Sequence, residues 1–495
     1  MNEVKKLAGQ TLIYGLGTIV PRFLHYAVLT PFYTRIFIDT KDYGVVTELY
    51  AWMVVLLVVL TYGMETSFFR FVQKKDESEK VYSAALISLF ITSAAFIALV
   101  NIFIAPVSAL MNYSDTPGYI RMFAAIVAID AFTAIPFAKL RKENKPLHFS
   151  IIKIANVILT IGLVVFLLKI APNIYQKSDG WFRNIYNPEY KVGYIFVANL
   201  IASFATMLML LPVILKTKLT FDVALWKRMF YYSFPLLLAG LSGSINDAID
   251  KILLRRMIGG EEGLEVLGKY GAAYKIAVLM GLFIQMFRFA AEPFFFERAN
   301  RKDAKETYAF VMKYFIIVML IVFLGINLYI SGFQYIIGPN YRDALVIVPI
   351  ISMGYLLYGI YLNHSIWYKL NDLTRYAIYI TVIGTVITIL INCLFIPSFG
   401  YMASAWAHVA SYGAMIIFSF LFAEKHYKVN YSMHKMAPYF VIAIAMVIFA
   451  CCFEYGSLAL ELVVNTLFII IFIGYAQYKD KFLTLVFSKN ENRDN

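Results

Sequence analysis

Long apolar stretches separated by short polar ones follow one another along almost the whole chain. A hydrocarbon core of about 30 Å needs about 20 apolar residues in a helix that rises about 1.5 Å per residue. The stretches lack the alternation over about ten residues that barrel strands show, so we predict helices. The fourteen predicted segments cover residues 8–36, 43–67, 81–106, 117–139, 147–170, 190–215, 230–257, 266–295, 307–332, 344–367, 373–397, 400–423, 436–456 and 458–478.

Composition supports a membrane protein. Of the 495 residues, 61% are hydrophobic and 15% are charged, whereas soluble chains have about 45–50% and about 25%. This excludes a soluble enzyme with one anchor and a disordered chain. The net charge of +13 would suggest nucleic acid in a soluble protein. Here the basic residues are spread over short loops, so we expect membrane lipids as partners and no nucleic acid.

The distribution of Lys and Arg predicts the orientation. With the N-terminus in the cytoplasm, the cytoplasmic ends and loops carry 27 of the 44 basic residues, and the external ones carry 11. This excess predicts that both termini are cytoplasmic and that the number of helices is even. The first apolar run is too long for a cleavable signal peptide, so we expect it to remain as the first helix.

The chain also repeats itself. An ungapped shift of 227 residues places residues 43–71 on residues 270–298, with six of 29 positions identical. Because one offset carries several helices, we interpret helices 1–6 and 7–12 as two copies in the same orientation. Such parallel repeats are typical of transporters whose binding site lies between the halves. Matching positions include Glu65 with Glu292 and Lys142 with Lys369.

We therefore predict an all-α, polytopic membrane protein with about 14 transmembrane helices. It would consist of two six-helix lobes and an added pair of helices. Between the lobes, Leu219, Val223 and Trp226 share one face of a stretch that we expect to lie flat in the cytoplasmic interface. The predicted parts are an N-terminal lobe over residues 1–215, this linker over 216–229, a C-terminal lobe over 230–425, and the helix pair with a tail over 426–495.

Cations inside the apolar segments are candidate binding residues. An ionisable side chain near mid-bilayer costs roughly 2.5–3.5 kcal/mol, so it usually faces water or a partner. Arg22 lies near the centre of helix 1, and Arg288 lies deep in helix 8. Either one fits the wall of an anion-binding cavity, and the alternative is an ion pair with a carboxylate on another helix. Lys275 in helix 8 and Lys251 in helix 7 are further candidates.

Acidic residues in the same segments are candidate groups for ion coupling or gating. Asp247 and Asp250 in helix 7 either take up a cation or proton or pair with Lys251 and Arg255 on their own helix. In the repeat, Glu48 of helix 2 occupies the position that Lys275 occupies in helix 8. Opposite charges at such positions are able to face each other across a cleft.

Five other polar residues complete this set. His25 lies three residues after Arg22 and is either a proton-sensitive group or a satisfied core residue. Asp130 in helix 4 is a candidate proton site or a partner of Arg22. Glu65 and Glu292 lie at the inner ends of helices 2 and 8, where they would form a cytoplasmic gate or interfacial ion pairs. Lys153 lies near an inner helix end, so we expect its side chain to snorkel.

Motifs of catalysis are missing from the sequence. No group of His, Cys and Asp has metal-ligand spacing, and no nucleophile motif is present. We therefore predict a protein that is not an enzyme and has no cofactor or metal, apart from a coupling ion, H⁺ or Na⁺.

Several stretches in order along the chain resemble a known family. The resemblance covers most of residues 10–425, and the order and spacing of the stretches make the match specific. The family is that of the polysaccharide and O-antigen flippases of the multidrug/oligosaccharidyl-lipid/polysaccharide exporter superfamily. The matching stretches are LTPFYTR at 29–35, DYG at 42–44, YGMETSFFRF at 62–71, DK at 250–251, GKYGAAYK at 268–275 and PSFGYMASA at 397–405.

This resemblance implies a two-lobed, V-shaped bundle in the bacterial cytoplasmic membrane that alternates between inward-open and outward-open forms. The implied substrate is an oligosaccharide linked to undecaprenyl pyrophosphate, which moves to the outer leaflet for surface polysaccharide or O-antigen biosynthesis. The implied driving force is an ion gradient or the membrane potential. Candidate partners are a glycan polymerase and chain-length machinery. Arg22 and Arg288 would hold the pyrophosphate in the cavity.

The resemblance also bears on the substrate and on the added helices. Lipid II flippases have more arginines near the start of helix 2, where this chain has Glu48, which argues against lipid II as the substrate. In that group an extra C-terminal pair lines a groove for the lipid tail, and helices 13–14 would serve likewise. Two alternatives remain from the sequence. One is a multidrug–cation antiporter on the same plan, which should prefer an anionic cavity. The other is a membrane polysaccharide polymerase, which usually needs a larger extramembrane segment.

Overall fold

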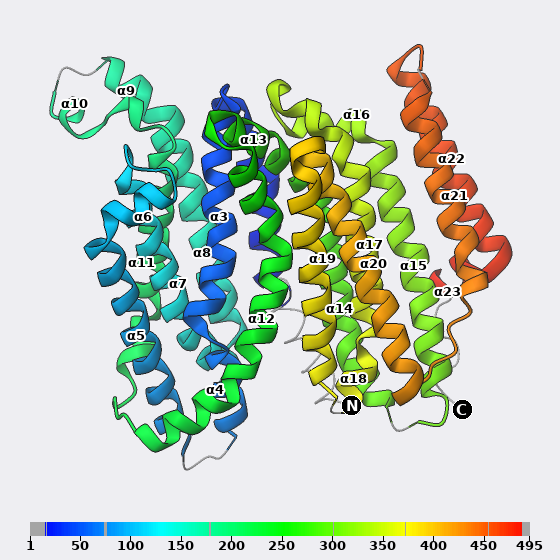
Figure 1. Ribbon diagram of the computed structural model, residues 1–495, viewed down its shortest axis with the longest axis horizontal. Helices are drawn as coiled ribbons and strands as arrows, with labels where there is room; N and C mark the ends of the chain where they lie inside the picture. Colours follow the sequence, from blue (N-terminus) through cyan, green and yellow to red (C-terminus); the bar gives the residue numbers. More distant parts are fainter. Residues whose placement is uncertain are drawn as a thin grey trace. The chain divides into compact units, whose positions relative to one another are not determined.

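The computed structural model describes residues 15, 17–73, 77–177, 180–299, 301–371, 373–453 and 455–487. Throughout these ranges the regular structure is helical, without a strand, which confirms the predicted all-α class. The chain divides between Gly271 and Ala272 into two compact units, and this division falls within one helix. Figure 1 shows the helices of both units in sequence colours.

Unit 1 begins with a helical stretch over 17–24 and contains the elements of the first half of the chain. These are η1 (His25–Leu29), α2 (Thr30–Ile36), α3 (Thr40–Thr61), α4 (Met64–Phe71), α5 (Ser78–Ile102), α6 (Ile104–Leu110), α7 (Pro117–Lys142), α8 (Pro146–Val165), η3 (Phe166–Ile170), α9 (Ala171–Lys177), α10 (Phe182–Ile185), η4 (Pro188–Tyr190), α11 (Gly193–Leu215), α12 (Val223–Ile258) and the first part of α13 (Gly260–Ala277).

Unit 2 holds the end of α13 and all later elements. These are α14 (Leu279–Arg298), α15 (Ala304–Leu328), α16 (Ile330–Phe333), η5 (Gln334–Ile336), η6 (Pro339–Ile347), α17 (Val348–His364), α18 (Ile366–Leu370), α19 (Arg375–Phe399), α20 (Tyr401–His426), α21 (Met433–Cys452), α22 (Leu458–Asp480) and α23 (Phe482–Phe487).

Twelve helical spans among the described residues are long and apolar enough to cross a membrane. They correspond to twelve of the fourteen predicted segments. The first predicted segment, 8–36, lies partly outside the described residues. The seventh, 230–257, is present as the second part of α12, but its many charged residues set it apart from the apolar spans. The chain is therefore a multi-pass membrane protein with one unusually polar long helix.

The predicted linker over 216–229 differs from the structure. Its last residues are the start of α12, which continues through Pro235 to Ile258 without interruption. Asp222 caps this helix, because its side chain accepts a hydrogen bond from the Leu225 backbone N–H at 3.0 Å. Leu219 and Val223 are exposed, as side chains in an interface would be, but Trp226 packs with the core of unit 1. α12 runs along the lower edge of Figure 1 before it turns upward.

A break between α3 and α4 makes room for α12. Tyr62 and Gly63 both have left-handed backbone angles, with φ of 33° and 70°. Glycine is favoured at the second position, since a Cβ there would come within 2.9 Å of the Ser233 carbonyl oxygen of α12. The Trp226 indole donates to Ser88 Oγ at 2.7 Å, and the same hydroxyl bonds Tyr62 Oη. The start of α12 is thus tied to α3 and α5.

Helices α3 and α13 approach each other at the level of their backbones. A Cβ added to Gly44 would overlap the Leu264 carbonyl oxygen, and one added to Gly268 would overlap the Thr40 carbonyl oxygen. Small residues at both positions permit this approach, as at many helix contacts in membranes. The motifs DYG and GKYG, which carried part of the family resemblance, supply these glycines. They are therefore packing residues of unit 1.

The units repeat each other in local detail. Phe68 and Tyr82 form an edge-to-face ring pair in unit 1, with centroids 6.2 Å apart. Phe295 lies one repeat of 227 residues after Phe68, and it forms the same kind of pair with Tyr308 at 5.1 Å. Glu65 forms an ion pair with Arg141, and its repeat partner Glu292 forms one with Lys369 at 2.6 Å. In both units, therefore, the second helix of the repeat is joined to the fourth at the basic end of the bundle.

The C-terminal pair α21 and α22 is fastened to α15. Asp480 at the end of α22 accepts hydrogen bonds from Lys313 Nζ and Tyr439 Oη, each at 2.6 Å. Further along α22, Asn465 Nδ2 donates to the Leu328 carbonyl oxygen at 2.5 Å. Lys313 of α15 therefore ends in an ion pair with Asp480 of α22.

The division into units does not follow the predicted lobes. The sequence placed the boundary in the linker at 216–229, whereas the compact units separate after Gly271. The physical reason is that α12 packs on α3 and α4 and α13 crosses α3, so both belong with the first half by contact. The assignment of α12 to the second repeat rests on the sequence offset and stays a prediction.

We expect Gly268→Ala to destabilise the protein by about 1–3 kcal/mol, because the added Cβ overpacks the contact of α13 with Thr40. The measurement is thermal unfolding of the purified protein in detergent. Gly325→Ala is the matched control, since a Cβ at this glycine of α15 would meet nothing within 4 Å. An equal Tm for the two variants would contradict the close approach of α3 and α13.

Candidate functional site

Arg22 lies on the first helical stretch, and its side chain is exposed. Within the described part of the chain it has no carboxylate within ion-pair distance. His25 begins the π-helical turn η1 and packs edge-on against the rings of Tyr26 and Tyr50, with centroids 6.1 and 6.3 Å away. A π-turn changes the angular spacing of residues. From His25 onward the residues of η1 therefore do not keep the angular spacing of the preceding helical stretch.

Asp130 lies inside unit 1, on α7. Its carboxylate accepts a hydrogen bond from Ser203 Oγ of α11 at 2.8 Å. No ion pair joins Asp130 to Arg22 among the described residues, so the predicted pairing of the two is not what the structure shows. The ammonium of Lys153 lies 4.0 Å from the centroid of the Phe137 ring. Lys153 of α8 therefore makes a cation–π contact with α7.

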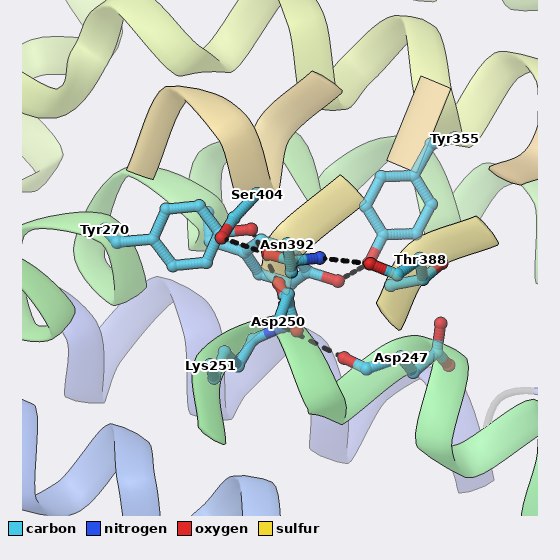
Figure 2. Close-up of polar contacts among 9 residues, drawn as sticks. Asp247, Asp250, Lys251, Tyr270, Tyr355, Thr388, Asn392 and Ser404 are labelled. Carbon is cyan, nitrogen blue, oxygen red and sulfur yellow. Dashed lines mark hydrogen bonds and ion pairs between the residues drawn. The ribbon is translucent and has the colours of Figure 1, made fainter. Parts of the chain in front are cut away.

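A buried ion pair lies in the C-terminal third of α12. Lys251 Nζ donates to both carboxylate oxygens of Asp250, at 3.0 and 3.1 Å, and to the Asp247 backbone carbonyl at 2.9 Å. Tyr270 Oη donates to Asp250 at 2.6 Å. Figure 2 shows Asp250 with Lys251 and Tyr270 around it. Asp250 is fully buried, whereas the Asp247 side chain is exposed. The internal pairing that the sequence allowed for helix 7 is therefore the arrangement of Asp250 and Lys251.

Glu48 is the centre of a second buried network. Its carboxylate is fully buried and lies 3.5 Å from Arg255 Nε and 3.9 Å from an Arg256 nitrogen. Tyr113 Oη donates to it at 2.8 Å. Arg255 and Arg256 also donate to the backbone carbonyls of Gly260 and Leu110. Glu48 therefore ties α3 to α12 and to the loop before α7.

The sequence analysis named Glu48 and Arg255 but did not predict that they form an ion pair. It did not identify Arg256 or Tyr113. A loop tyrosine carries no signal of its own in a chain with 36 tyrosines. Because Glu48 and Tyr113 are far apart in the chain, only folding brings them together.

Arg288 lines a pocket inside unit 2. The pocket lies between α14 and the region where α17 ends and α18 begins. Arg288 is partly exposed and has no ion-pair partner among the residues that the structure describes. Lys275 of α13 is also partly exposed. The pocket is lined by Ile284, Phe287, Arg288, Ala291, Glu292, Phe295, Leu362, Asn363, Ile366 and Lys369.

Two buried polar contacts in unit 2 were missed by the sequence analysis. Asn392 of α19 is fully buried, donates to the Thr388 carbonyl at 2.8 Å and accepts from Ser404 Oγ of α20 at 2.7 Å; these residues are labelled in Figure 2. His364 of α17 is buried as well and lies 2.7 Å from Ser419 Oγ. Isolated Asn and His residues inside long apolar runs were the available signal.

The candidate residues therefore fall into two classes. The carboxylates of Asp250 and Glu48 and the cations of Lys251 and Arg255 neutralise one another in buried networks. Arg22 and Arg288 are partly or fully exposed arginines without a carboxylate partner in the described ranges, so each is able to receive an anionic ligand. No cluster of three or more His, Cys, Asp or Glu side chains suits a metal ion in the ranges described.

Comparison with known proteins gives the family and the fold. Residues 7–299 match the sequence model of a family described as "Polysaccharide biosynthesis protein". A search of curated proteins finds no match.

Among solved structures, the chain is similar to the lipid II flippase MurJ in an inward closed conformation. The TM-score is 0.69 at 15% identity, with 94% of this chain and 99% of that chain covered. It is also similar to a multidrug resistance MATE family transporter of the MOP superfamily in an inward-facing conformation. There the TM-score is 0.65 at 16% identity, and 84% of this chain and 97% of that chain are covered. At such identities the likeness concerns the fold. Since the family match spans more than half of its residues, this chain belongs to the polysaccharide biosynthesis protein family, with the multi-pass fold shared by the MurJ flippase and the MATE transporters.

Proposed function

We propose that the protein is a flippase for a lipid-linked oligosaccharide, of the undecaprenyl-pyrophosphate type, which it moves from the cytoplasmic to the outer leaflet for surface polysaccharide or O-antigen biosynthesis. The observation that carries the proposal is the match of residues 7–299 to the polysaccharide biosynthesis family. The fold supports the proposal, because the structural match to the MurJ flippase covers 94% of this chain, whereas the match to the MATE transporter covers 84%.

The physics of the substrate agrees with the presence of Arg22, which is exposed, and Arg288, which is partly exposed. A pyrophosphate carries about two negative charges and does not cross hydrocarbon without fixed cations and water. Arg22 in unit 1 and Arg288 in unit 2 have no carboxylate partner in the described chain, so pyrophosphate oxygens would be their counter-charge. The polyprenyl tail is able to stay in lipid throughout, and the exposed apolar side chains of α21 and α22 offer it a surface.

Orientation and driving force follow from charge. We place the basic ends of the helices in the cytoplasmic part of a bacterial inner membrane, with both termini inside. An inside-negative potential would favour the return of an emptied cationic site, by about 2.3 kcal/mol per charge per 100 mV. Asp130, Asp247 and His25 remain candidates for a coupling H⁺ or Na⁺. A glycan polymerase with its chain-length machinery would act on the delivered substrate.

The buried networks take a different role in this proposal. Glu48 and Asp250 are paired, so they would hold unit 1 together while Arg22 and Arg288 contact substrate. The predicted role of Glu48 in coupling or gating is then replaced by a structural one. The same pairing means that Glu48 does not leave an unpaired negative charge to repel a pyrophosphate.

We expect Arg22→Ala and Arg288→Ala each to abolish glycan export, because each removes a cation that holds the pyrophosphate. The measurement is surface polysaccharide in cells that depend on this protein for export. Arg22→Lys and Arg288→Lys should restore part of it, since they return the charge without the bidentate geometry. Membrane levels of each variant, checked by immunoblot, serve as the control for folding. Full export in both alanine variants would overturn the assignment, and drug resistance without a glycan defect would favour the antiporter.

We expect Glu48→Ala to lower stability by about 3–5 kcal/mol, because it leaves Arg255 buried without its counter-charge. The measurement is the Tm of the purified protein together with its yield from membranes. Glu261→Ala is the matched control: its 2.9 Å pair with Lys41 is exposed, and such pairs contribute about 0–1 kcal/mol. A stable Glu48→Ala protein that has lost export would instead support the gating role.

A further inference from the structure

The pocket of unit 2 combines an apolar wall with four polar side chains. Arg288 and Glu292 come from α14, Asn363 from the end of α17 and Lys369 from α18. The remaining lining is aliphatic or aromatic, with Phe287 and Phe295 as its largest members. A ligand that fits this lining carries a polar head with an apolar group directly attached.

Two of the polar groups have no hydrogen-bond partner among the residues that the structure describes. Asn363 is only 4% exposed, and its side-chain Nδ2 has no hydrogen-bond partner among the described residues. Buried polar groups normally have partners, so an unpaired amide donor beside a pocket indicates a missing acceptor. Arg288 lines the same pocket, and its guanidinium has five donors and needs acceptors as well.

The third donor, Lys369, forms an ion pair with Glu292, and a ligand would be able to displace this carboxylate. Its Nζ lies 2.6 Å from Glu292 Oε1, and the two side chains are 29% and 41% exposed. Ion pairs with this much exposure are weak, because water competes for both charges. An incoming anion with several oxygens would replace one carboxylate oxygen on Lys369 and reach Arg288 and Asn363 at the same time. A phosphate group offers acceptor oxygens in several directions. The cavity itself, about 10 Å³, has room for about one water, so the phosphate would bind at its open mouth.

We propose that this pocket is a binding subsite for the phosphate of a polyprenyl lipid, in which the phosphate displaces Glu292 from Lys369. Arg288, Asn363 and Lys369 donate to the phosphate oxygens, and Phe287 and Phe295 contact the first apolar carbons of the chain. Glu292 acts as a resident counter-charge that neutralises Lys369 while the subsite is empty. The proposal rests on the proposed flippase function and names the part of unit 2 that recognises the lipid phosphate.

The role of Glu292 separates this arrangement from a plain structural ion pair. If Glu292 competes with the ligand, Glu292→Gln removes the competitor and binding becomes tighter. If the pair only holds α14 to α18, the same substitution leaves binding unchanged or weakens it. Gln has nearly the same shape as Glu, so the variant is expected to fold.

The experiment measures binding of farnesyl pyrophosphate and of inorganic pyrophosphate to the purified full chain by isothermal titration calorimetry. For farnesyl pyrophosphate we expect Glu292→Gln to lower the Kd about threefold to tenfold. We expect Lys369→Ala and Asn363→Leu each to raise the Kd about tenfold, which is the loss in affinity expected when one charge-assisted hydrogen bond is removed. Glu424→Gln is the matched control, because it breaks an exposed 2.9 Å pair with Lys428 elsewhere in unit 2, and its Kd should equal that of the wild type. Each Tm is recorded so that only folded variants are compared.

A Kd for Glu292→Gln equal to or above that of the wild type would overturn the displacement. Inorganic pyrophosphate binding as tightly as farnesyl pyrophosphate would show a free-phosphate site and overturn the lipid assignment. If Arg22→Ala still abolishes export, neither of these two results contradicts the proposed flippase function. A wild-type protein that binds neither probe and exports no glycan would instead remove the proposed function itself.

Discussion

A charge inside hydrocarbon needs an opposite charge, a hydrogen-bonding partner or water, and the arrangement of this protein follows from that requirement. α12 carries Asp250, Lys251 and Arg255 along one helix, which alone would be too polar to cross a bilayer. The carboxylate of Asp250 neutralises Lys251, and Glu48 of α3 neutralises Arg255. The polar helix α12 is therefore stable in the membrane only because it packs against α3.

Close backbone contact serves the same arrangement. Gly44 and Gly268 bring α3 and α13 together, and Gly63 admits the start of α12 at the break between α3 and α4. Without side chains at these points, dispersion forces between helices act at short range, which is the main attraction available where lipid is as apolar as the protein. Glu48 consequently lies where both arginines reach it.

Two candidate arginines lie outside these buried networks. Arg22 and Arg288 stand without carboxylate partners in the described ranges, in a family concerned with polysaccharide biosynthesis and a fold shared with a flippase. The unit 2 pocket adds an unpaired amide and a partly exposed ion pair beside Arg288. The charges that the folded protein leaves unpaired are therefore our candidates for substrate binding, because the buried networks neutralise the others.

The sequence by itself determined the class of the protein, nearly all of its helices, the internal repeat and the family. These features depend on the length and hydrophobicity of local segments and on motif order, which are written along the chain. The tertiary structure alone decided that Glu48 joins Arg255 and Tyr113, that Lys153 points at Phe137 and that Asn363 lies unpaired beside Arg288. Side chains of this length have several rotamers within reach of different helices. Their partners are therefore set by how the helices pack, which no single segment encodes.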